Sequence, residues 1–321
     1  MGMHVVVGRG AVGNGLAREL VRLGHEVTQV SRTGGAVPGA RSVSQDAADG
    51  TALAAVAAGA DTLYNCVNPP YEKWATAWPP IATAMLMAAE RTGAGLVTIG
   101  NLYPYGPVDV PMTEDLPDVG SGVKARVRAA MWRDALALHR AGRIQATEAR
   151  ASDFYGPEVV DTGLLASRAL PALLKGKKVR VMGDPDAPHT FTYVPDVART
   201  LAVLGTDERS WGRLWHVPSA EPPTQRQALT RMAELAQAPA AKVGRLPDPA
   251  LKVLGLAVPL LRELQETAYQ RTRPYILDST AATTTFGITA TPLDDGLAAT
   301  VSWWRSRTGS QQPAAPDTRV A

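Results

Sequence analysis

Apolar and polar residues alternate along the N-terminal half of the chain in a way that predicts strands and helices in turn. The apolar run 4–7 is followed by glycines and then by apolar residues at helical spacing, with Gly24 placed to end the helix. The same rhythm predicts strands at 26–30, 61–67, 95–99 and 143–150, and helices at 49–58, 72–91 (kinked at Pro79 and Pro80) and 123–140. Such alternation is typical of an α/β, Rossmann-type doubly wound fold with a parallel sheet.

The rhythm changes after residue 150. A long proline-containing loop is expected at 100–122, and from Ser152 onward glycine and proline loops alternate with short strands at 179–182 and 214–217. We predict a dinucleotide-binding Rossmann domain at 1–150, to which parts of 184–217 return. A smaller C-terminal substrate-binding lobe is expected at 151–307, and a disordered tail at 308–321.

Composition narrows the class of protein. The chain is 45% hydrophobic with a net charge of +3 and no long basic run, so we expect a small-molecule substrate, anionic or aromatic, rather than nucleic acid. A single cysteine, Cys66, suits a reducing compartment, and we expect no signal peptide, no membrane span and a cytoplasmic location. The sequence contains neither H-E-x-x-H nor G-x-S-x-G, so it supports neither a metal site nor a serine hydrolase.

The first glycine loop is the strongest motif. Gly8-Arg9-Gly10-Ala11-Val12-Gly13 matches G-x-G-x-x-G between a predicted strand and a predicted helix. In this motif the first glycine permits a tight turn, the second lets a pyrophosphate approach the backbone, and the third lets the helix pack on the strand. A plain tight turn is the alternative.

The end of the second strand indicates NADP(H) rather than NAD(H). NAD-binding proteins usually place an acid there, whereas this chain has Ser31 and Arg32, which can bind a 2′-phosphate. Arg9 is within reach of the same phosphate. Asp46, after the third strand, is a candidate for the adenine amino group. Alternatively, Arg32 is a solvated surface arginine and Asp46 a turn residue.

Three segments resemble the NAD-dependent epimerase/dehydratase family, the extended short-chain dehydrogenases. They are LVTIGNLYPYG at 96–106, RASDFYGP at 150–157 and GDPDAPHTFTYVPDVA at 183–198. The resemblance covers most of the chain and implies hydride transfer assisted by a Tyr-x-x-x-Lys pair. The chain departs from the family in its glycine loop. The family normally has G-x-x-G-x-x-G, whereas this chain has the tighter G-x-G-x-x-G. It departs again because none of its eight tyrosines has a lysine four residues further on.

The missing pair leaves other candidates for catalysis. By the resemblance, Lys124 and Arg128 occupy the two positions of the pair, and Asn101 the position of its serine or threonine partner. Tyr103 is a candidate replacement acid whose pKa Lys124 would lower, and Tyr71 is a second candidate. Lys124 and Arg128 share a helix face beside the expected cofactor, and their charges predict a nearby anion; a solvated basic face is the alternative.

The remaining predicted contacts come from position along the chain. Val12 in the glycine loop, and Val67 and Asn68 at the end of the predicted strand 61–67, are expected at the cofactor, as is Lys124 from the predicted helix 123–140. The candidates for substrate contacts are Tyr71, Tyr103, Arg128, Asp153, Phe154, His189 and Tyr193. His189 as a satisfied structural group is the alternative reading of that residue.

These features predict an NADP-dependent oxidoreductase acting on a small carbonyl, imine or activated alkene. One alternative is a redox-silent NADP sensor, which the missing pair favours. A sugar-nucleotide epimerase or dehydratase is the other, although Asn101-Leu102-Tyr103 offers no carboxylate for dehydration. A homodimer is expected by family analogy alone.

Overall fold

The computed structural model describes the chain except for residues 161–162, 168, 248–262 and 310–321. Seven strands form the central sheet: β1 (Met3–Val7), β2 (Glu26–Ser31), β3 (Arg41–Ser44), β4 (Thr62–Asn65), β5 (Gly95–Asn101), β6 (Ala146–Ala151) and β10 (Leu214–His216). The helices around it are α1 (Ala11–Arg22), α2 (Gly50–Val56), α3 (Trp74–Thr92), α4 (Val123–Arg140) and α6 (Val194–Leu204).

The strands lie in the order β10-β6-β5-β4-β1-β2-β3, and every pair is parallel. This order reverses direction between β1 and β4, which confirms the predicted doubly wound Rossmann fold. In such a sheet a ligand binds outside the carboxyl ends of the strands at the reversal. The carboxyl ends of β1 and β4 therefore mark where a site is expected.

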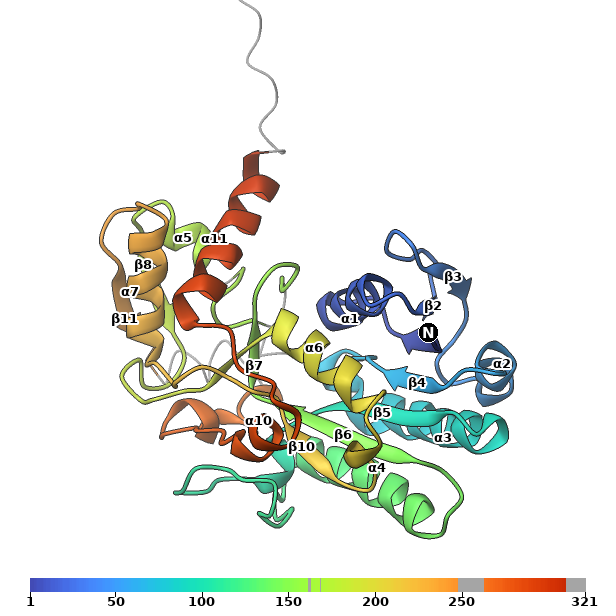
Figure 1. The fold of residues 1–321 in the computed structure, drawn as a ribbon. Coiled ribbons are helices and arrows are strands. Elements are labelled where there is room, and N and C mark those ends of the chain that lie inside the picture. Colours follow the sequence, from blue (N-terminus) through green and yellow to red (C-terminus); the bar gives the residue numbers. More distant parts are fainter. Residues whose placement is uncertain (161–162, 168, 248–262, 310–321) are drawn as a thin grey trace, which may run out of the picture.

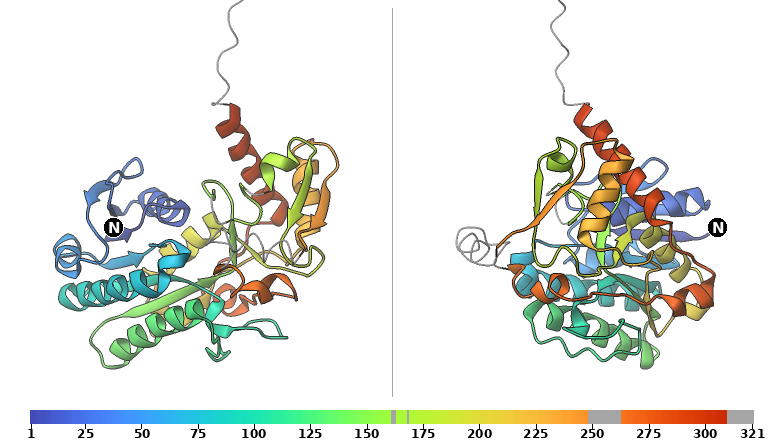
Figure 2. Two further views of the ribbon diagram at one scale, coloured as in Figure 1. Left: turned by 180° about the vertical axis from the view of Figure 1, so that it is seen from behind. Right: turned by 90° about the vertical axis from the view of Figure 1, so that its left-hand side faces the viewer.

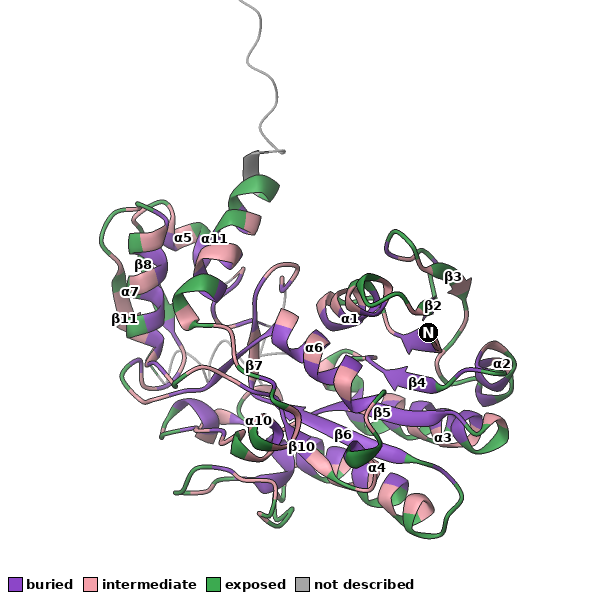
Figure 3. Cartoon of the chain, viewed as in Figure 1, coloured by how far each residue is buried: buried purple, intermediate pink, exposed green. Residues whose placement is uncertain are grey.

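Helices cover both faces of this sheet (Figure 1). On one side α1 packs against α6, and on the other α3 packs against α2 and α4. Strand β1 is buried on both faces, since Val5, Val6 and Val7 are at most 1% exposed and contribute to two different core clusters. Figure 3 shows the same burial along the central strands. A strand covered on both sides reads as a continuous apolar run, as β1 does.

A smaller group of elements stands at the carboxyl side of the sheet, as the two views of Figure 2 show. It contains a parallel pair of strands, a second parallel pair, three helices and a short helix: β8 (Lys178–Val181) with β11 (Lys242–Arg245), β7 (Asp153–Tyr155) with β9 (Phe191–Tyr193), α7 (Gln225–Leu235), α10 (Thr280–Phe286), α11 (Leu293–Gly309) and α5 (Leu170–Leu173). Four 3-10 turns complete the described elements: η1 (Tyr71–Lys73), η2 (Tyr103–Tyr105), η3 (Glu208–Ser210) and η4 (Ala268–Arg271).

Several element boundaries differ from those expected. Strand β6 begins at Ala146 rather than 143, because residues 141–145 form the turn that leaves α4. Helix α3 begins only at Trp74 and includes both prolines. Residues 310–321 of the tail predicted at 308–321 lie outside the described residues. None of the described helices has the length and apolar character needed to cross a membrane.

Candidate functional site

The glycine loop between β1 and α1 has one open position and two closed ones. Gly8 has a φ of +125°, and a Cβ there would lie 2.5 Å from the Cys66 carbonyl oxygen. A Cβ on Gly13 would lie 2.3 Å from the Gly8 oxygen, so neither position has room for a side chain. Gly10 caps the start of α1 and has nothing within 4 Å of its would-be Cβ. The loop thus offers free backbone space at the N-terminus of a helix, where an anion is favoured.

A cleft of about 440 Å³ opens from this loop along the carboxyl ends of the central strands. Ten of the predicted site residues line it: Gly10, Val12, Val67, Asn68, Tyr71, Asn101, Tyr103, Arg128, Asp153 and Phe154. The other predicted residues lie outside its lining: Gly8, Arg9, Gly13, Ser31, Arg32, Asp46, Lys124, His189 and Tyr193. The Tyr193 ring packs against the Tyr155 ring, with 5.2 Å between the two ring centres.

The candidates for the adenosine end lie beyond the cleft, after β2. Arg9 Nη1 and the Ser31 hydroxyl both donate to the Gly34 carbonyl oxygen, each at 2.9 Å. Asp46 accepts from the Ala48 N–H at 3.0 Å, which is the geometry of a turn. Arg32 is exposed, and its guanidinium makes no hydrogen bond or ion pair within the described part of the chain. Arg32 therefore remains exposed to solvent directly after β2.

Two tyrosines meet at the wall of the cleft. Tyr71 in η1 and Tyr103 in η2 are hydrogen-bonded through their hydroxyls, and Asn101 Oδ1 accepts from the Tyr103 N–H at 3.1 Å. Burial raises the pKa of Tyr103 well above its ordinary value, and it raises that of Tyr71 to about 12. The expectation that Lys124 lowers the Tyr103 pKa is wrong, because burial raises this pKa, and the neighbouring Tyr71 and Asp153 raise it further. Both phenols stay protonated at neutral pH.

Lys124 is held by carboxylates from the C-terminal part of the chain. Its Nζ lies 2.6 Å from Glu263 and 3.3 Å from Glu266, and its backbone N–H donates to Glu266 at 2.7 Å. Gly122 allows this approach, since a Cβ there would lie 2.2 Å from Glu266. The anion expected near the basic first turn of α4 is therefore provided by the protein itself. Lys124 Nζ also lies 5.6 Å from the centre of the Tyr71 ring.

Arg128 lies one turn further along α4 and lines the cleft. Its guanidinium packs on Trp74 and Trp78, at 4.9 and 4.2 Å from the rings, and Nη1 donates to the Ile99 carbonyl oxygen at 3.1 Å. Burial lowers its pKa to about 10, so it remains a cation at neutral pH. Its Nε has no partner within the described part of the chain. A ligand oxygen reaching that N–H would remove an unfavourable buried donor.

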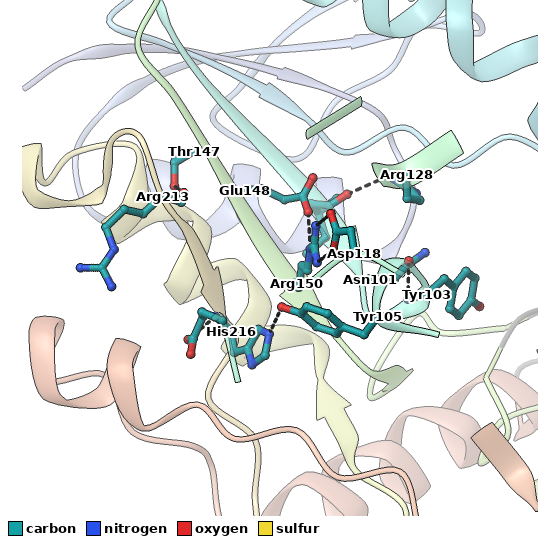
Figure 4. A network of polar contacts seen from close by, with 12 residues as sticks. Asn101, Tyr103, Tyr105, Asp118, Arg128, Thr147, Glu148, Arg150, Arg213 and His216 are labelled. Atoms are coloured by element: carbon teal, nitrogen blue, oxygen red, sulfur yellow. Dashed lines mark hydrogen bonds and ion pairs between the residues drawn. The ribbon is translucent and has the colours of Figure 1, made fainter. Parts of the chain in front are cut away.

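A buried polar network lies beside the cleft and was not predicted from the sequence (Figure 4). Arg150 donates from Nε to Glu148 at 2.7 Å and from both terminal nitrogens to Asp118, at 2.6 and 3.0 Å. Tyr105 is hydrogen-bonded to His216 at 2.8 Å. Asp118 belongs to the long loop after η2, so this network fixes that loop against β6. We assign it a structural role.

The far wall of the cleft comes from β7, η4 and the segment after η4. Asp153 bonds His189 at 2.8 Å, and Gln270 and Tyr275 complete the wall. Gln270 Nε2, Tyr275 Oη and Ser152 Oγ are buried without partners among the described residues. Sequence reasoning missed Ser152, Gln270 and Tyr275. Ser152 lies within the recognised 150–157 segment, while nothing local distinguishes Gln270 or Tyr275. No cluster of three metal-binding side chains occurs in the described residues.

The comparisons with known proteins agree with this architecture. The sequence profile of the NAD dependent epimerase/dehydratase family matches residues 4–213. A dTDP-glucose 4,6-dehydratase of Streptomyces griseus is 26% identical over 235 residues, which make up 72% of this chain. The chain spans 65% of the length of that curated relative.

Solved structures show the same fold at low identity. The dTDP-glucose 4,6-dehydratase of Bacillus anthracis, in complex with NAD, has a TM-score of 0.80 at 15% identity, covering 96% of this chain and 98% of that one. The UDP-glucuronic acid 4-epimerase of Bacillus cereus, also with NAD, has a TM-score of 0.79 at 16% identity, covering 98% and 99%. With its fold and the profile match together, the chain belongs to the NAD dependent epimerase/dehydratase family.

Proposed function

We propose that this protein binds a nicotinamide dinucleotide and transfers hydride at an oxygen-bearing carbon of its substrate. The observation that carries the proposal is the open position at Gly10, which faces the same cleft as the Tyr71–Tyr103 pair. The residues fit the cofactor: Gly10 and Val12 would hold the pyrophosphate through the start of α1, and Arg128 would reach a ligand oxygen in the cleft. The bound nicotinamide would supply or accept the hydride.

We further propose that the cofactor is NADP(H). Arg32, which directly follows β2, is exposed and makes no side-chain hydrogen bond or ion pair with any described residue, and 30–33 contains no carboxylate that would repel a 2′-phosphate. The two solved relatives described above were obtained with NAD, so a preference for NADP(H) would set this chain apart from them. Comparing the two cofactors tests it directly.

The cleft wall supports an oxygen-bearing substrate with an apolar ring or face. Tyr71, Trp74, Phe154 and Tyr275 line it together with the polar side chain of Gln270. Because Tyr103 stays protonated, it is suited to donating a hydrogen bond to a carbonyl oxygen. A small carbonyl compound fits this description.

The comparisons favour a sugar nucleotide as the substrate class. The relatives are described as a dTDP-glucose 4,6-dehydratase and a UDP-glucuronic acid 4-epimerase. The sequence argued against a dehydratase because 101–103 contains no carboxylate. Asp153 on β7 places a carboxylate at the cleft, which weakens that objection. Epimerases and dehydratases share the hydride step proposed above.

Fluorescence titration of the purified protein with NADPH and NADH tests cofactor binding. No binding of either cofactor at concentrations of about tens of micromolar would end the proposal. Turnover is then measured with dTDP-glucose, UDP-glucuronic acid and a panel of aromatic ketones. Binding without turnover on any of these would favour the redox-silent sensor.

A further inference from the structure

The hydrogen bonds of His189 require one proton more than a neutral histidine carries. Nδ1 lies 3.0 Å from the Gln270 carbonyl oxygen, and Nε2 lies 2.8 Å from Asp153 Oδ2. A carbonyl oxygen and an ionised carboxylate only accept, whereas a neutral imidazole has one N–H and one acceptor nitrogen. Both contacts form only if His189 is doubly protonated or if the Asp153 carboxyl carries the proton.

His216 provides a comparison within the same fold. Its Nδ1 also faces a carbonyl oxygen, that of Asp278 at 2.7 Å, but its Nε2 lies 2.8 Å from the Tyr105 hydroxyl. A hydroxyl can donate, so neutral His216 satisfies both contacts. Burial lowers the pKa of His216 to about 4, in keeping with a neutral ring. His189 differs from His216 because its Nε2 faces the Asp153 carboxylate, whereas Nε2 of His216 faces the Tyr105 hydroxyl.

The extra proton lies at the wall of the cleft. Asp153 lines the cleft from β7, and His189 stands behind it, 1% exposed and stacked on the Tyr275 ring at 5.4 Å. Besides His189, three tyrosines among the described residues are affected by the charge of Asp153. Its negative charge adds to burial in raising the pKa values of Tyr71, Tyr103 and Tyr275. These phenols hold their protons too tightly to exchange them readily at neutral pH.

We propose that Asp153, with His189 as its positioning residue, is the proton donor of the cleft. This inference rests on the hydride-transfer function proposed above. When a substrate carbonyl carbon receives hydride, the carbonyl oxygen takes the proton that Asp153 and His189 share. A C–H bond and an O–H bond form on the substrate, and the Asp153–His189 pair loses one proton. The substrate gains the two electrons that the nicotinamide loses, and water restores the proton. In its protonated form the Asp153–His189 pair is suited to carbonyl reduction, because that reaction needs a proton donor.

The location of the proton is measured by NMR on the full chain, labelled with ¹⁵N-histidine and ¹³C-aspartate, at about pH 7.5. We expect hydrogen on Nδ1 of His189 and a second proton on either Nε2 or the Asp153 carboxyl. His216 should show a single N–H in the same spectrum. A His189 with Nδ1 unprotonated, or with Nε2 unprotonated beside an ionised Asp153, overturns the proposal without any activity assay.

Asp153→Asn tests the role of the proton. The amide can donate to Nε2, so the hydrogen bond remains while the extra proton is lost. With the aromatic ketones named above and NADPH, we expect kcat to fall by about 10²–10⁴-fold, the usual range for a lost general acid, while the Kd for cofactor stays within about threefold. Asp134→Asn is the matched control, because Asp134 is exposed on α4 and, among the described residues, forms an ion pair with its neighbour Arg133 alone.

His189→Gln separates positioning from packing. A positioning role predicts a lower kcat and a changed pH profile, with little change in KM, whereas a packing role predicts lost stability alone. If wild-type protein binds no cofactor or turns over no probe, the proposed function fails, and the NMR result still decides where the proton lies. If wild-type protein turns over and Asp153→Asn keeps kcat within about threefold, the donor assignment fails alone.

Discussion

A methyl group added at Gly10 would project into open cleft, where nothing lies within 4 Å. The backbone there has φ −82° and ψ −174°, which alanine adopts without strain. Alanine restricts the unfolded chain, which stabilises by about 0.4–1 kcal/mol, but it is a slightly poorer helix cap than glycine. We therefore expect Gly10→Ala to change the free energy of unfolding by less than about 1 kcal/mol.

Cofactor binding should respond very differently. The methyl would occupy the space through which a pyrophosphate approaches the first N–H groups of α1. Losing one hydrogen bond to a charged group costs about 1.5–3 kcal/mol, which corresponds to a Kd increase of about 10- to 150-fold. Gly13→Ala is the contrasting variant: its Cβ would lie 2.3 Å from the Gly8 oxygen, so it should destabilise folding by about 1–3 kcal/mol.

Fluorescence titration gives the Kd for NADPH and NADH, and denaturant unfolding gives stability. The reasoning requires Gly10→Ala to separate the two measurements. If Gly10→Ala binds both cofactors as tightly as wild type, the pyrophosphate does not lie over Gly10. A Gly10→Ala protein that unfolds much more easily would instead contradict the open geometry described for this position.

Further outcomes follow from single groups. Arg32→Ala should weaken NADPH binding by about tenfold or more with little effect on NADH, while Arg140→Ala, at the far end of α4, changes neither; equal losses for both cofactors would refute the 2′-phosphate assignment. Lys124→Ala should lower the free energy of unfolding by about 3 kcal/mol in denaturant titrations, because two carboxylates lose their cation; a loss below about 1 kcal/mol would contradict this. Burial lowers the pKa values of His4 and His216 to about 4. The unfolded chain therefore takes up these protons first, and each histidine should cost up to about 1.4 kcal/mol of stability per pH unit as pH falls from 6.5 to 4. His216→Gln should flatten that dependence.

The sheet and the glycine loop could be predicted because their signals are local. The turn, the open position and the helix start all lie within 8–13, and the alternation of strands and helices repeats over short windows. The partners of Lys124 could not be predicted in this way, since Glu263 and Glu266 lie 139 and 142 residues further along the chain. Basic residues in the first turn of a helix predict a nearby anion, but they do not indicate whether a ligand or another part of the chain provides it.

The chemistry of the tyrosines was misjudged for a related reason. Sequence position suggested that a cation would lower the Tyr103 pKa, but burial depends on the packing of η1, η2, α3 and β7 together. The same limit applies to His189: its place in a recognised segment could be predicted, whereas its two acceptor partners come from β7 and η4. The hydrogen-bond donors and acceptors around His189 can be counted only when the positions of β7 and η4 in the fold are known.

The seventh strand of the sheet, β10, comes from far along the chain, and α6, which covers one face together with α1, precedes it closely. During synthesis the ribosome releases 1–150 first. That nascent segment has the pairing edge of β6 open and one face of its sheet only partly covered, and an open strand edge is prone to pair with other chains. Expression of the N-terminal segment by itself should therefore favour aggregation, and a separately produced Rossmann half would need residues up to about 216 to close its own sheet.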